Sequence, residues 1–162
     1  MIKIYNYGEV ENSEIFARQN TEENVSRAVS EIIAEVVKNG DKALVSYAEK
    51  FDGANLAALE VTDAEIKEAF GAVDPAFIAV LEEAAVNIRH FHEKQVRSSF
   101  VINDKDGVVM GQKVMPIEKV GIYVPGGTAA YPSTVLMDSI PAKIAGCAEI
   151  VMVTPPLASG KV

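Results

Sequence analysis

The sequence is poor in the residues that build disulfide frameworks, metal centres and basic surfaces. Its 162 residues include one cysteine, two histidines and no tryptophan. The single Cys147 cannot form an internal disulfide, which favours a reducing compartment such as the cytoplasm. Fifteen lysines and arginines against 23 acidic residues give a net charge of -8. The chain is therefore a poor candidate for binding nucleic acid, which rewards clustered basic residues.

Long hydrophobic runs are also lacking. No uninterrupted apolar segment approaches the roughly 20 residues that a membrane-spanning helix needs, and the N-terminal MIKIYNYGEV lacks the apolar core of a signal peptide. We therefore expect neither a membrane partner nor export. The chain is 49% hydrophobic and 23% charged, which is typical of a globular protein, and its length is about that of one domain that can bury a core.

The first part of the chain is predicted to be mainly helical. We expect a short strand at residues 2–6 and then a helix between Thr21, a candidate N-cap, and Gly40, a candidate stop. Apolar residues recur between them at intervals of three and four, the spacing of one helical face. Another helix should follow from Asp41 and end in a turn at Asp52-Gly53.

Two further helices have clear start signals. Thr62 and Glu65 have the spacing of a capping box, and Asp74 precedes a proline that is tolerated at the first helical position. The second of these helices is expected to bury one face, made of Phe77, Ile78, Leu81, Ala85, Ile88 and Phe91.

The pattern changes after residue 98. SFVINDKDGVVMGQKVMP predicts a β-hairpin that turns at Asp106-Gly107. EKVGIYVPGG, STVLMDSIPAKIAGC and AEIVMVTPP then predict a strand, a helix and a strand, with the strands at residues 120–124 and 149–153. The last strand is nearly all apolar, which is typical of a parallel strand covered on both faces.

The predicted fold class is therefore α/β, with a boundary near Pro116. Residues 1–116 form a helical region with a hairpin, and residues 117–162 form the first strand-helix-strand of an open sheet. Two parallel strands with one helix do not make an independent sheet, so this sheet is incomplete. Pro141 lies inside the crossover helix and predicts a kink or a restart.

The segment GIYVPGGTAAYPST, residues 121–134, links the first parallel strand to this helix. Gly126 and Gly127 allow a close backbone approach, and the helix N-terminus attracts an anion such as phosphate. Ser133 or Thr134 is expected to cap the helix. The segment is neither G-x-G-x-x-G nor a P-loop, so a tight turn without a ligand is an equally open interpretation. Tyr123 is either a core aromatic or a residue facing the ligand crevice.

The other residues with reactive side chains carry weaker signals. His90 and His92 are two positions apart on a predicted helix, so they point in nearly opposite directions and cannot share a metal ion. One solvated and one semi-buried histidine are expected. Cys147 is expected to be a buried, inert thiol because no base has the spacing to activate it.

Residues 120–156, VGIYVPGGTAAYPSTVLMDSIPAKIAGCAEIVMVTPP, closely resemble histidinol dehydrogenase. NGDKALVSYAEKFD and VNIRHFHEKQ upstream look like the N-terminal region of the same family. The resemblance implies oxidation of L-histidinol to L-histidine through the aldehyde, with two NAD and one zinc ion. It also implies a cytoplasmic homodimer with two large Rossmann-like domains per subunit, the second of which would begin at residue 117 and bind NAD.

The resemblance also implies particular site residues. Tyr123 matches the family tyrosine that contacts NAD, and Pro125, Gly126 and Gly127 form the adjoining loop. Small hydroxyl residues, here Thr128 and Ser133, are usual nearby.

The family's catalytic Glu-His pair and its zinc ligands, a Gln, two His and an Asp, match nothing in this chain. We therefore expect an N-terminal portion of the enzyme that is inactive alone, with no catalytic or zinc-binding residue of its own. Two other interpretations stay open. One is a non-catalytic module that pairs with a partner through the exposed edge of the strand at residues 149–153. The other is a stand-alone nucleotide-binding domain.

Overall fold

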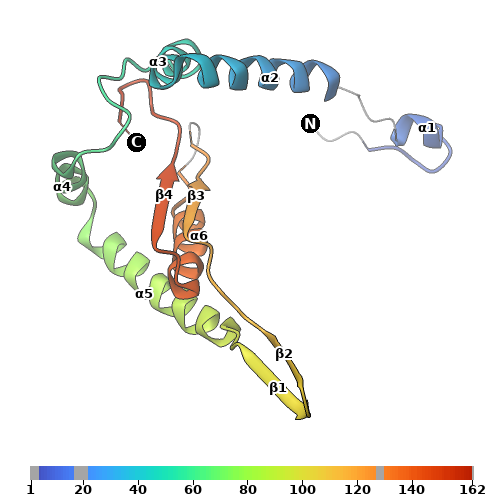
Figure 1. Ribbon diagram of the computed structural model, residues 1–162. Helices are drawn as coiled ribbons and strands as arrows, with labels where there is room; N and C mark the ends of the chain where they lie inside the picture. Colours follow the sequence, from blue (N-terminus) through green and yellow to red (C-terminus); the bar gives the residue numbers. More distant parts are fainter. Residues whose placement is uncertain (1–3, 17–21, 127–129, 162) are drawn as a thin grey trace. The chain divides into compact units, whose positions relative to one another are not determined.

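The computed structural model describes residues 4–16, 22–126 and 130–161 of the chain (Figure 1). The chain forms two compact units, residues 1–44 and 45–162. The expected N-cap Thr21 and the expected site residues Gly127 and Thr128 lie outside the described residues.

The first unit contains the helices α1 (Asn12–Ile15) and α2 (Glu22–Asn39) and the start of α3 (Asp41–Tyr47). Gly40 ends α2 as predicted, since its φ of 57° is left-handed and its N–H donates to the carbonyl of Val36 at 2.8 Å. Residues 4–6 form no strand, so that prediction is wrong for them. A short strand needs a pairing partner, and among the described residues this segment has none.

The second unit begins within α3, which continues into the π-helical turn η1 (Ala48–Asp52) and stops at Gly53. Gly53 has a φ of 67°, and the predicted turn is confirmed. The helix α4 (Asp63–Ala72) follows, and its capping box is complete. The N–H of Thr62 donates to Glu65 Oε2 at 2.7 Å, and the N–H of Glu65 donates to Thr62 Oγ1 at 3.3 Å.

The long helix α5 (Pro75–His92) starts where the sequence predicts, with Asp74 Oδ1 accepting from the N–H of Ala76 at 2.9 Å. A short 3₁₀ turn, η2 (Glu93–Gln95), ends it. The predicted hairpin is also confirmed: β1 (Phe100–Lys105) pairs antiparallel with β2 (Val108–Gln112), and Gly107 turns the chain with a φ of 75°.

The rest of the unit is a parallel strand pair joined by a helix. β3 (Lys119–Tyr123) and β4 (Glu149–Val153) pair in parallel, with Ile122 opposite Met152, and α6 (Pro132–Ala145) connects them (Figure 1). The helix contacts both strands and covers one face of the pair. Ile122 on β3, Val124 directly after β3 and Ile140 on α6 are buried. α6 runs through Pro141 without a restart, so that alternative is wrong.

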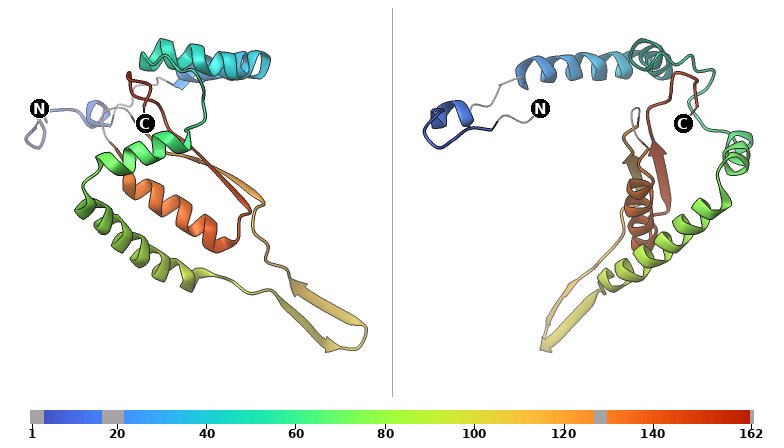
Figure 2. Two further views of the ribbon diagram at one scale, coloured as in Figure 1. Left: turned by 90° about the vertical axis from the view of Figure 1, so that its left-hand side faces the viewer. Right: turned by 180° about the vertical axis from the view of Figure 1, so that it is seen from behind.

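α5 packs against α6, and the two helices lie side by side in the views of Figure 2. Helices from the two sides of Pro116 therefore share one layer, while the predicted domain boundary there stays a prediction. The expected buried face of α5 is confirmed only in part. Ile78, Leu81, Ala85 and Ile88 are half-buried, but Phe77 and Phe91 are exposed. A single neighbouring helix covers a narrow stripe, and both phenylalanines lie outside it.

The second face of the β3–β4 pair is not covered within the described residues. Tyr123, Val151 and Val153 are exposed there. The expectation that β4 is covered on both faces is therefore wrong for this chain, because the one crossover helix shields a single face. The core is correspondingly small: the hydrophobic residues buried in the described part of the chain are Ala43, Ala48, Ala54, Ile122, Val124 and Ile140.

Gly111 on β2 generates the first prediction. A Cβ at this position would lie 2.5 Å from the carbonyl oxygen of Phe100 on β1. We expect Gly111→Ala to destabilise the hairpin by about 1–3 kcal/mol, since a backbone atom cannot move aside without breaking the pairing. Cross-strand nuclear Overhauser effects between Val101 and residue 111 should weaken or vanish.

Gly121→Ala on β3 is the control, because a Cβ there meets nothing within 4 Å in the described structure. Unchanged cross-strand contacts in the Gly111→Ala chain would contradict the prediction.

Candidate functional site

The carboxyl ends of β3 and β4 lie together, and the segment singled out in the sequence starts there. The pairing continues one residue beyond β3, where the N–H of Val124 donates to the carbonyl of Val153 at 2.9 Å. Val124 is buried, whereas Tyr123 is 63% exposed on the open face of the strand pair. Within the described residues Tyr123 is therefore not buried in a core, and its ring is accessible at the edge where open α/β sheets bind ligands.

The loop after β3 lies against the segment after β4. A Cβ on Gly126 would be 3.1 Å from Thr154 Oγ1 and 3.3 Å from the carbonyl oxygen of Pro155. Pro125 and Gly126 are both exposed. The structure thus brings Tyr123, Pro125 and Gly126 to one end of the strand pair. It adds Thr154 and Pro155, whose only signal in the sequence is that the TPP motif directly follows a strand.

The N-terminus of α6 begins differently from the prediction. Tyr131 is the N-cap and Pro132 occupies the first helical position, so Ser133 and Thr134 lie inside the first turn. The expectation that either residue caps the helix is therefore wrong. Proline at the first turn is favoured because its missing N–H has no partner to lose there. The first turn contains no acidic residue, so no carboxylate in it offsets the partial positive charge of the helix end.

The histidines and the cysteine lie elsewhere. His90 is exposed and His92 is half-buried, with its Nδ1 2.7 Å from Gln95 Oε1. This is the arrangement that the sequence predicts for the pair. Cys147 follows the left-handed Gly146 at the end of α6 and is half-buried, not fully buried as expected. Within the described residues no three His, Cys, Asp or Glu side chains gather in a way that could hold a metal ion.

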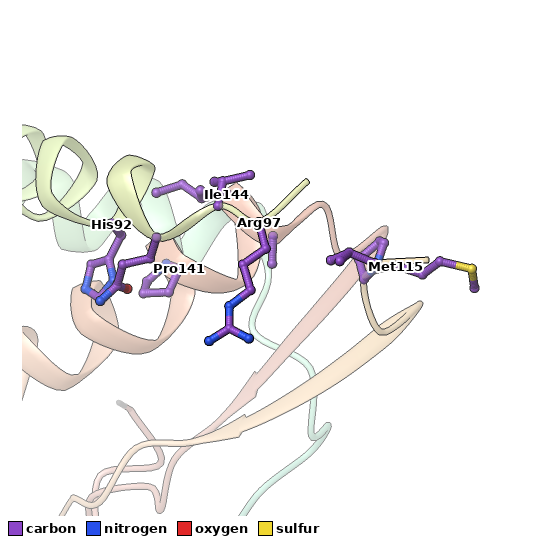
Figure 3. A pocket seen from close by; sticks show the side chains of 10 residues that line it. His92, Arg97, Met115, Pro141 and Ile144 are labelled. Atoms are coloured by element: carbon purple, nitrogen blue, oxygen red, sulfur yellow. The ribbon is translucent and has the colours of Figure 1, made fainter. Parts of the chain in front are cut away.

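A cavity of about 410 Å³ lies at the opposite end of α6 from Tyr131. Its walls come from the end of α5, the base of the hairpin and the last turn of α6, and Figure 3 labels His92, Arg97, Met115, Pro141 and Ile144 among them. The cavity is mostly apolar. No sequence pattern predicts this cavity, because its lining comes from segments that are far apart along the chain.

Comparisons with known proteins agree on one family. The family model described as histidinol dehydrogenase matches residues 16–162. The chain belongs to the histidinol dehydrogenase family. It is 50% identical over 150 residues to the histidinol dehydrogenase of Listeria monocytogenes serovar 1/2a, with 91% of this chain and 35% of the relative aligned. It is 41% identical to that of Heliobacterium mobile, with all of this chain and 39% of the relative aligned.

A solved histidinol dehydrogenase has a similar fold. The crystal structure of the enzyme from Elizabethkingia anophelis matches with a TM-score of 0.84 and 38% identity, over 90% of this chain and 34% of that chain. The resemblance to histidinol dehydrogenase and the mixed helix-and-strand fold class are both confirmed. The chain spans about a third of the length of these relatives, and it corresponds to their N-terminal third. None of the described helices is long and apolar enough to cross a membrane.

The helices that begin after Thr62 and Tyr131 should respond differently to the loss of a hydroxyl side chain near their first turn. Thr62→Ala should lower the free energy of local opening at the amide of Ile66 by about 1 kcal/mol, because it removes a side-chain cap. Ser133→Ala should change the value at Val135 by less than about 0.5 kcal/mol, since Ser133 caps nothing in the described structure. Amide hydrogen exchange followed by NMR measures both.

The cost of Thr62→Ala should also depend on pH. Hydrogen bonds from the backbone and then the side chain of Thr62 lower the pKa of Glu65 below 4.5. A carboxylate with a lowered pKa stabilises the folded state above its ordinary pKa, and this contribution is lost as the pH falls through the lowered value. Equal costs for the two alanine variants at neutral pH would contradict the assignment of the caps.

Proposed function

We propose that this chain supplies part of the NAD-binding site of a histidinol dehydrogenase. The whole enzyme would oxidise L-histidinol to L-histidine through the aldehyde, with two NAD and a zinc ion, as a cytoplasmic homodimer. The observation that carries the proposal is the exposed ring of Tyr123 at the carboxyl edge of β3, next to the close-packed Gly126. The family match over residues 16–162 supports the choice of reaction.

Three features of the edge suit a dinucleotide. The ring face of Tyr123 offers an apolar surface on which a flat ring of the cofactor can stack. Gly126 is exposed, and because it has no Cβ it packs closely on Thr154 and Pro155, which places its backbone at this edge. The first turn of α6 has a partial positive charge that no acidic side chain in it neutralises, although the N–H of Thr134 already donates to the carbonyl of Tyr131 at 3.1 Å. We propose Tyr123, Pro125, Gly126 and Gly127 as the residues that hold NAD.

The chemistry assigned to these residues is binding and orientation. Bound NAD would accept the hydride that leaves the substrate carbon. The contribution of this chain is to hold the cofactor at a defined place, which converts an encounter between free molecules into a reaction at fixed geometry. No described residue at the edge has the placement of a general base, so we assign none of them a proton transfer.

The described residues do not fit the family's zinc ion. His90 and His92 are separated, and His92 is paired with Gln95. No step is therefore derived through zinc, and we propose that the zinc ligands and the catalytic pair belong to parts of the enzyme outside this chain.

The proposal predicts NAD binding by the chain itself. In ¹H–¹⁵N NMR spectra, millimolar NAD should shift the resonances of Tyr123 and Gly126. Tyr123→Ala should weaken binding about tenfold, because aromatic pairs and buried rings contribute on the order of 1 kcal/mol or more. Val151→Ala is the control, since Val151 is exposed on the same face but lies within β4, away from the edge. Wild-type spectra unchanged by millimolar NAD would refute the proposal.

The uncovered face of the strand pair favours a second candidate, a module that pairs with another chain. Val151 and Val153 are exposed on this face, and within the described residues β3 and β4 pair only with each other. Unpaired edges and apolar faces promote association. Sedimentation velocity should then show concentration-dependent association that Val151→Lys reduces. A sharply monomeric profile at high concentration would count against this candidate.

A further inference from the structure

Gly126 makes a close contact with the segment after β4, which lies outside the residues proposed to hold NAD. The nearest atoms to a Cβ built on Gly126 are Thr154 Oγ1 at 3.1 Å, the carbonyl oxygen of Pro155 at 3.3 Å and Pro155 Cδ at 3.4 Å. All three belong to two consecutive residues beyond the end of β4. Gly126 therefore rests directly on Thr154 and Pro155.

The need for glycine at position 126 arises from this close approach and not from an unusual backbone angle. Several glycines of the chain have a left-handed φ, among them Gly40, Gly53 and Gly146, but the φ of Gly126 is outside that region. Any residue can adopt its backbone conformation, so the space beside it is what excludes a side chain. Gly121, on β3, is the opposite case, because a Cβ there meets nothing within 4 Å in the described structure.

The contact is held in place by the sheet. The hydrogen bond from the N–H of Val124 to the carbonyl of Val153 fixes the two segments next to each other, two residues before Gly126 and one residue before Thr154. Val124 is buried against the helix side, so this part of the backbone cannot move freely. The side chain of Thr154 then determines how near Gly126 comes to β4, and with it where the exposed backbone of Gly126 lies relative to Tyr123.

We propose that Thr154 is a positioning residue of the dinucleotide site. It acts through Gly126: its side chain sets the gap between Gly126 and the end of β4, and with it the place of the Gly126 backbone that a bound dinucleotide would contact. This inference rests on the proposed function, because it assigns a role in binding NAD. Thr154 is assigned this role because it contacts Gly126, and not because it belongs to a motif.

A double-mutant cycle tests the inference. Gly126→Ala should raise the NAD dissociation constant of the 162-residue chain about tenfold, because the new methyl group pushes the loop away from Thr154. Thr154→Ala alone should also weaken binding, by about threefold, because Gly126 loses the side chain on which it rests. The Gly126→Ala/Thr154→Ala chain should recover most of the lost affinity, because removing Oγ1 makes room for the methyl group. Dissociation constants come from NMR titration, followed at Tyr123.

Thr154→Val provides the matched control. Valine has nearly the shape of threonine, so the Gly126→Ala/Thr154→Val chain should bind as weakly as Gly126→Ala alone. A merely stabilising role of Thr154 would not distinguish alanine from valine in this way. Additive effects of Gly126→Ala and Thr154→Ala, or equal recovery with valine, would overturn the inference while leaving the proposed function intact. Absence of NAD binding in the unmodified chain would instead overturn the proposed function and this inference with it.

Discussion

The parallel pairing of β3 with β4 is the interaction on which the rest of the candidate site depends. It places two strand ends side by side that are 30 residues apart in the sequence, with Tyr123 opposite Val153. Parallel strands need a crossover, and α6 supplies it while shielding the hydrophobic residues on one face. Ile122, Val124 and Ile140 are buried between these elements. Without this pairing, Thr154 would not lie against Gly126, and Tyr123 would not lie at the edge of a sheet.

The same pairing leaves the strand pair unfinished within the described residues. One helix covers one face, and the other face exposes Tyr123, Val151 and Val153. Two-stranded sheets bury too little apolar surface to be stable without further packing. The same applies to the hairpin of β1 and β2, whose residues are all exposed. The described residues therefore leave much apolar surface exposed, in a chain that spans about a third of its relatives' length.

Local signals in the sequence predicted the local structure well. The capping box at Thr62, the start at Asp74, the stop at Gly40 and the turn at Gly107 are all governed by neighbouring residues, and all are confirmed. Predictions that depended on distant partners did less well. Phe77 and Phe91 have the right spacing for a buried face, but burial requires a neighbour that spacing cannot supply. The contact of Gly126 with Thr154 likewise joins residues whose proximity only the strand register reveals.

The candidate site divides in the same way. Composition and the loop pattern pointed to a ligand site near Tyr123. They did not exclude that Tyr123 is a core residue or that the loop is a turn without a ligand. Within the described residues Tyr123 is 63% exposed, which favours the interpretation that it faces the crevice, while its role stays a prediction. The proposal that NAD is the ligand comes from the resemblance to one family. The cavity lined by His92 and Pro141 lies at the other end of α6 and is the competing place for a small molecule (Figure 3).

The most direct test is therefore to locate NAD on the chain by intermolecular nuclear Overhauser effects. The ring of Tyr123 reports on the carboxyl edge, and the methyl group of Met115 reports on the cavity. The account predicts contacts between cofactor protons and the Tyr123 ring, and none to Met115. Contacts to Met115 with none to Tyr123 would place the ligand in the cavity and contradict the assignment of the edge as the NAD-binding site.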